Sequence, residues 1–332
     1  MDGLKGIENN SKNSNNNNKT IAFILIGIVS IMLVIGILLI AIGLLDMDYI
    51  GMPGNSVAVI HIQGVIISSN MPGGFGIATS GDIINSLRSA EDDSSIQSIV
   101  LRINSPGGTP AAAQEIVREM ERITKPIVVS MGDIATSGAY YISAPSDHII
   151  ASEDTLTGSI GVIWVFENRE AYFKEEGIRH IVFTSGDKKD MGGPWRNLTN
   201  EEEDLIDDIL TQVHRRFVRT IVDGRNLTTR EVNRIADGRI ILGYDAKEYG
   251  LIDGFGNLQD AIYYAAELGG IIGDPTVVDM NQPSLARLLF GSESTIYKQD
   301  NVEHNQYLKK SMQGNLWAIP VFKIDTMFAK GV

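Results

Sequence analysis

A serine flanked by small residues is the first candidate for chemistry in this sequence. Residues 133–141 read Asp-Ile-Ala-Thr-Ser-Gly-Ala-Tyr-Tyr and follow an apolar, strand-like run at 126–132. Ser137 would stand where a strand passes into a helix, with its hydroxyl beside backbone N–H groups that favour negative charge. Gly138 has no side chain to block a carbonyl, so its N–H could stabilise an oxyanion. The pattern indicates a nucleophilic serine, although most serines at such positions simply cap a helix.

A glycine turn upstream could complete the oxyanion site. Residues 104–108 read Asn-Ser-Pro-Gly-Gly and follow an apolar strand at 98–103, and the apolar spacing predicts a helix over 109–123. In a right-handed β-α-β unit, this turn and the serine turn lie at the carboxyl ends of adjacent parallel strands. Gly108 would then offer a second N–H donor beside Ser137. Without a base, however, two tight turns are an ordinary feature of α/β proteins.

A serine hydroxyl becomes a good nucleophile only when another group takes its proton. None of the five histidines stands in a comparable turn, and each is predicted to be structural or on the surface: His61, His148, His180, His214 and His304. The other solution is a serine–lysine dyad, in which burial lowers the lysine pKa by roughly 3–5 units. A short strand is predicted at 180–183, and the loop after it carries Lys188 and Lys189. Composition alone predicts that both lysines are solvated.

Four motifs in this order resemble the signal peptide peptidase A family. They are the runs at 104–108, 135–141, 153–162 and 185–190, and the resemblance covers roughly residues 55–270. The family consists of membrane-anchored serine–lysine peptidases with the Clp protease/crotonase fold. The resemblance therefore implies an α/β fold of repeated β-β-α units and a serine endopeptidase, a hydrolase that needs no cofactor.

The resemblance also implies a role for each motif. Ser137 would be the nucleophile. Lys189, rather than the lysine before it, would be the general base, because the family pattern is Ser-Gly, two variable positions, Lys-Asp. Ser159 would hydrogen-bond the lysine amine, and the N–H groups of Gly108 and Gly138 would bind the oxyanion.

The N-terminal region predicts a membrane anchor. Residues 21–45 are uncharged and almost entirely apolar, which is long enough to cross a bilayer core of about 30 Å. Lysines precede this run and aspartates follow it directly, so the positive-inside rule predicts a single-pass protein of the cell membrane. Its N-terminus would be cytoplasmic and its catalytic domain extracytoplasmic. The Asn-rich tail at 1–20 is predicted to be disordered.

Composition limits the remaining possibilities. The net charge of −13 argues against nucleic acid as a partner, and the absence of cysteine excludes disulfides and thiol catalysis. No spacing typical of metal ligands occurs in the sequence. After the tail and the transmembrane helix, the predicted organisation is a serine peptidase domain at 55–270 and a C-terminal extension at 271–332 with a packing or assembly role.

The resemblance implies that the substrates are remnant signal peptides and similar apolar peptides. The alternatives are a related membrane protease that acts on a stomatin-like partner, a crotonase-fold acyl-CoA enzyme, and a non-catalytic scaffold. Family members with one copy of each motif form rings in which neighbouring subunits supply the serine and the lysine. We therefore expect a cyclic homo-oligomer, with an octamer as the expected size, and Trp164 and Trp195 are candidates for its interfaces.

Overall fold

The computed structural model describes residues 30, 32–34, 54–69 and 76–281. The chain divides into two compact units, Met1–Met52 and Pro53–Val332. The predicted tail at 1–20 and residues 282–332 of the predicted extension lie outside the described residues. So does the predicted span at 21–45, apart from residues 30 and 32–34. Among the helices that are described, none is both long enough and apolar enough to cross a membrane.

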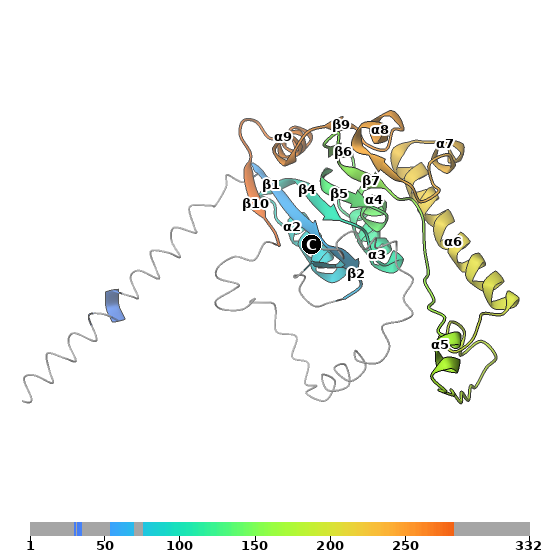
Figure 1. Ribbon diagram of the computed structural model, residues 1–332. Helices are drawn as coiled ribbons and strands as arrows, with labels where there is room; N and C mark the ends of the chain where they lie inside the picture. The colour runs from blue at the N-terminus through green and yellow to red at the C-terminus, as the bar shows by residue number, and fades with distance from the viewer. Residues whose placement is uncertain (1–29, 31, 35–53, 70–75, 282–332) are drawn as a thin grey trace, which may run out of the picture. The chain divides into compact units, whose positions relative to one another are not determined.

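A mixed sheet of eight strands forms the centre of the second unit (Figure 1). Its strand order is β10-β1-β4-β5-β6-β9, and β7 pairs with both β5 and β8. The β7–β8 pair is antiparallel, and the other pairs are parallel. The strands are β1 (Ser56–Gln63), β4 (Ile96–Ser105), β5 (Ile127–Thr136), β6 (His148–Ala151), β7 (Leu156–Gly158), β8 (Ile240–Leu242), β9 (Gly254–Phe255) and β10 (Thr276–Asp279). A small parallel sheet pairs β2 (Val65–Ile67) with β3 (Ile77–Thr79).

Helices cover both faces of the sheet, so its central strands are apolar on both sides. In β1, Val57 and Val59 lie in a cluster with apolar residues of α9. The alternate residues Ala58, Ile60 and Ile62 lie in the larger core with residues of α2, α3, α4 and α6. The helices are α2 (Ser80–Asp92), α3 (Pro110–Met120), α4 (Gly138–Ser143), α5 (Glu170–Glu175), α6 (Asn200–Arg225), α7 (Thr229–Asn233), α8 (Gly243–Glu248) and α9 (Leu258–Leu268).

The element order agrees with the predicted β-β-α repeat only in part. Strands β1, β2 and β3 precede α2, whereas β4 and β5 each lead directly into a helix. Beyond the boundary predicted at 270, β10 pairs with β1, so the sheet continues to Asp279. With these differences, the predicted α/β class holds, and the fold is built on a mixed sheet.

Residues 164–199, called the arm below, follow β7 in the chain and lead into the start of α6. They contain one short helix, α5, which buries no residue. Figure 1 shows α5 at the end of this excursion, close to the N-terminal end of α6. The strand predicted at 180–183 is wrong, because these residues are exposed and pair with no strand in the described part of the chain. An apolar β-branched run needs a neighbouring strand for its backbone groups before it forms a sheet.

Candidate active site

The glycine turn and the serine turn lie against each other, as the sequence predicted. Strands β4 and β5 are parallel neighbours, so both turns stand at the same edge of the sheet. The hydroxyl of Thr136 donates a hydrogen bond to the Pro106 carbonyl at 3.1 Å. A Cβ atom on Gly107 would lie 2.7 Å from the Gly138 nitrogen and 3.0 Å from the Ser137 Cβ. The two turns therefore form one compact unit.

Ser137 has a conformation that is unusual for a residue with a side chain. It precedes α4 with φ 54° and ψ −121°, in a region that costs about 1–3 kcal/mol for such residues. Its N–H donates to the Gly158 carbonyl at 2.8 Å. Its Oγ is buried and has no hydrogen-bond partner within the described part of the chain. A strained serine with an unsatisfied buried hydroxyl is typical of a site whose partner comes from a substrate or another chain.

The N–H of Gly108 is not used in the pairing with the neighbouring strand β2. Gly108 forms an isolated parallel bridge with Ile66. The two hydrogen bonds of this bridge are made by the residues on either side of Gly108. The Ile66 N–H donates to the Gly107 carbonyl at 2.9 Å, and the Thr109 N–H donates to the Ile66 carbonyl at 2.8 Å. The N–H of Gly108 consequently points away from β2. A Cβ on Gly108 would lie 1.8 Å from the Ile66 oxygen, so a side chain does not fit here.

The second expected donor, the N–H of Gly138, is the first of α4. The helix's hydrogen-bond ladder begins with the Tyr141 N–H and the Ser137 carbonyl, 2.9 Å apart. Gly138 therefore has no acceptor inside the helix. The N–H groups of Gly108 and Gly138 both belong to the unit that holds Ser137.

Ser159 lies at the same edge. Strand β7 runs parallel to β5 with Gly158 opposite Thr136, and Ser159 follows directly. Ser159 is buried and also has a positive φ, 49°. Its N–H donates to the Arg239 carbonyl at 2.7 Å. The structure thus brings the expected nucleophile, both expected donors and the expected lysine-orienting serine to one edge of the sheet.

Lys189 is not part of this group within one chain. It is exposed in the arm, and its N–H donates to the Gly186 carbonyl at 3.1 Å. Among the described residues, no hydrogen bond or ion pair joins its amine to Ser137 or Ser159. The preceding residue, Lys188, forms an exposed ion pair with Glu201 at 2.8 Å, and this hydrogen bond raises the pKa of Lys188.

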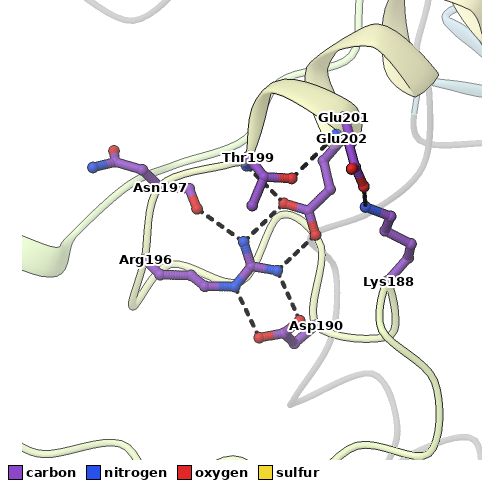
Figure 2. A network of polar contacts seen from close by, with 7 residues as sticks. All are labelled: Lys188, Asp190, Arg196, Asn197, Thr199, Glu201 and Glu202. Atoms are coloured by element: carbon purple, nitrogen blue, oxygen red, sulfur yellow. Dashed lines mark hydrogen bonds and ion pairs between the residues drawn. The ribbon is translucent and has the colours of Figure 1, made fainter.

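The arm also contains a cluster that the sequence did not predict. Arg196 binds the carboxylates of Asp190 and Glu202 together (Figure 2). Its hydrogen bonds hold the pKa of Asp190 at about 2 and that of Glu202 at about 2. The available signal was the spacing of Thr199 and Glu202, which is that of a capping box. The helix begins at Asn200, and Thr199 is its N-cap.

Two family models match this chain: Peptidase family S49 over residues 119–271 and Clp protease over residues 70–149. The protein named Putative protease slr0021, from Synechocystis sp., is 34% identical over 260 residues, a match that covers 76% of this chain and 90% of that protein. The chain belongs to peptidase family S49, the signal peptide peptidase A family. It is a peptidase, and the resemblance of its motifs to this family is confirmed.

Other S49 relatives differ in length from this chain. Protease 4 of Haemophilus influenzae is 34% identical over 235 residues, which is 68% of this chain but only 37% of that protein. The Putative signal peptide peptidase SppA of Enterococcus faecium is 38% identical over 184 residues, or 54% of each chain.

Proposed function

We propose that this peptidase is a membrane-anchored serine endopeptidase that works through a Ser137–Lys189 dyad. The main support for the proposal is the backbone conformation and the buried hydroxyl of Ser137 at the end of β5. Its hydroxyl is buried and unpartnered among the described residues, and its backbone is held at a positive φ. Gly108 and Gly138, the proposed oxyanion donors, belong to the same pair of turns as Ser137. This arrangement is that of a nucleophile with an oxyanion hole.

The proposed reaction has two halves. Neutral Lys189 takes the proton from the Ser137 hydroxyl while the Ser137 oxygen attacks the peptide carbonyl. The resulting oxyanion accepts hydrogen bonds from the N–H groups of Gly108 and Gly138. The C–N bond then breaks, and the lysine ammonium gives its proton to the leaving amine. A water molecule next loses a proton to the lysine and attacks the acyl ester. The ester C–O bond then breaks and the lysine ammonium returns its proton to the Ser137 oxygen, which releases the acid and restores Ser137 and neutral Lys189. Ser159 accepts or donates a hydrogen bond that orients the amine.

The exposed position of Lys189 is the reason to include a second subunit in the proposal. A lysine serves as a base near neutral pH only where burial lowers its pKa, and Lys189 is exposed in the single chain. In a cyclic homo-oligomer, with an octamer as the expected size, the arm of one subunit would lie over the serine of the next. Exposed apolar residues on the arm support such packing: Val165, Ile181, Val182 and Phe183.

Apolar peptides near a membrane, remnant signal peptides among them, are the proposed substrates. The apolar run at 21–45 would anchor the catalytic domain to the bilayer from the extracytoplasmic side. The printed name of the Enterococcus relative, a putative signal peptide peptidase, points to the same substrate class. The peptidase family match argues against the acyl-CoA enzyme that shares this fold.

A serine-reactive fluorophosphonate probe tests the dyad on the purified full-length protein. We expect labelling of the wild type at Ser137, none in Ser137→Ala, and a strongly slowed reaction in Lys189→Ala. The matched control is Lys188→Ala, which removes the adjacent amine and should label like the wild type. Labelling that persists in Ser137→Ala would exclude this nucleophile. Loss of labelling in Lys188→Ala, with Lys189→Ala unaffected, would show that the other lysine is the base.

A further inference from the structure

The guanidinium of Arg196 has every one of its five N–H donors bound in the arm and at the start of α6 (Figure 2). Nε and Nη2 bind the two oxygens of Asp190 at 2.9 and 2.7 Å. Nη1 and Nη2 bind the two oxygens of Glu202 at 2.8 and 2.7 Å. The last donor, on Nη1, binds the Asn197 carbonyl at 2.8 Å. Two bidentate carboxylates on one guanidinium fix its plane and its position.

Glu202 connects this cluster to the body of the protein. Its side chain is only 1% exposed, and it also accepts a hydrogen bond from the Thr199 N–H at 2.9 Å. The Thr199 hydroxyl accepts from the Glu202 N–H in return, which completes the capping box of α6. Further along α6, Phe217 and Ile221 are buried in the main core. One carboxylate of the cluster is therefore held by a helix that is fixed to the sheet.

The other carboxylate, Asp190, directly follows Lys189. Its side chain ties the lysine loop to Arg196, whereas α5 at the end of the arm buries no residue. The nearby Lys188–Glu201 pair has side chains 42% and 84% exposed, and pairs this exposed contribute little. The Arg196-centred cluster of Asp190, Arg196 and Glu202, called the clamp below, is thus the more buried of these two links between the lysine loop and α6.

We propose that Arg196 is a positioning residue for the peptidase reaction: the clamp holds the loop that carries Lys189 at a fixed place relative to α6. From that place the amine can reach a serine at the sheet edge of the neighbouring subunit. This inference rests on the proposed function. Lysine cannot replace the arginine, because an ammonium does not bind two carboxylates in bidentate geometry. Without the arginine, Asp190 and the buried Glu202 would repel each other.

Steady-state kinetics of Arg196→Lys and Arg196→Ala in the full-length protein, with a fluorogenic apolar peptide, test the proposal. A displacement of about 1 Å at a reacting group lowers the rate about 100-fold, so we expect a drop of that order in kcat with little change in KM. Added methylguanidine should restore part of the kcat of Arg196→Ala, but none in Lys189→Ala. The control is Arg169→Lys, because Arg169 makes a bidentate, exposed pair with Glu167 elsewhere on the arm. Its kcat should equal that of the wild type.

The outcomes separate this inference from the proposed function. If both Arg196 variants keep the kcat of Arg169→Lys, the clamp does not position the base, and the inference is overturned. If kcat falls only together with the melting temperature or the assembly size, and methylguanidine has no effect, the role is structural and the inference is again overturned. Should Arg196→Ala not fold, Arg196→Lys and Glu202→Gln decide by the same kcat and KM criteria. Full activity in Ser137→Ala or Lys189→Ala would instead refute the proposed function.

Discussion

Gly107→Ala should inactivate the enzyme because the added methyl group enters the space of the serine turn. Gly107 has φ +101°, and its Cβ would lie 2.7 Å from the Gly138 nitrogen, 2.9 Å from the Thr136 oxygen and 3.0 Å from the Ser137 Cβ. The first two contacts are with backbone, which cannot rotate away as a side chain can. The conformational strain alone costs about 1–3 kcal/mol. Relief of the contacts must move the expected oxyanion donor, and loss of one such donor lowers kcat about 100- to 1000-fold.

The matched control for this change is Gly270→Ala. Gly270 also has a positive φ, +71°, but no atom lies within 4 Å of its hypothetical Cβ. Both variants carry the strain of a left-handed residue, and only Gly107→Ala disturbs the serine turn. We expect Gly270→Ala to melt at a lower temperature with its kcat unchanged, whereas Gly107→Ala loses about 100-fold or more in kcat. The assay is peptide hydrolysis beside thermal denaturation. Equal kcat values for the two variants would refute the placement of this turn against the reacting serine.

Two further predictions concern the arm. Asp190 and Glu202 have pKa values of about 2 in the folded protein, below the ordinary values of about 3.9 for Asp and 4.3 for Glu. Their ionised carboxylates therefore stabilise the fold fully at pH values above the ordinary pKa values, and this stabilisation is lost as the pH falls toward 2. Stability measured by circular dichroism should therefore fall more steeply from about pH 5 to 2 in the wild type than in Arg196→Ala, and equal slopes would contradict the clamp. Phe183→Glu should leave the fold intact and reduce the assembly size in light scattering, because Phe183 is 92% exposed on the arm. The control Ile272→Glu changes a residue that is 96% exposed outside the arm, and an unchanged size in both variants would exclude the arm from the interface.

The sequence predicted the two turns and the helix after the glycine turn because their signals are local. Apolar runs followed by the glycine turn and the serine turn located the ends of β4 and β5, and the helix predicted over 109–123 corresponds to α3. The right-handed β-α-β rule then placed Ser137 beside the glycine turn, as the structure shows. These inferences needed only neighbouring residues and the chirality of the chain.

The features that the sequence did not predict depend on partners distant in the chain or absent from it. Residues 180–183 have the composition of a strand but lie exposed, since strand formation requires a neighbouring strand. Strand β10 joins the sheet by pairing with β1, where Thr276 lies opposite Ser56. These two residues are far apart in the sequence. From the sequence alone, Arg196 could form an ion pair with any of many acidic residues. Only the three-dimensional arrangement identifies Asp190 and Glu202 as its partners. In the proposed assembly, the place of Lys189 relative to a serine would depend on a neighbouring subunit, which the sequence of one chain does not describe.

Complementation between two inactive variants tests the central claim most directly. Full-length Ser137→Ala and Lys189→Ala proteins are each dissociated, mixed, and allowed to reassemble, and hydrolysis of the apolar peptide is measured against each variant reassembled alone. If neighbouring subunits share the site, some interfaces in the mixed ring pair an intact Ser137 with an intact Lys189, and part of the wild-type activity returns. A mixed oligomer of wild-type size that remains inactive would contradict the account, because it would show that each dyad is built within a single chain.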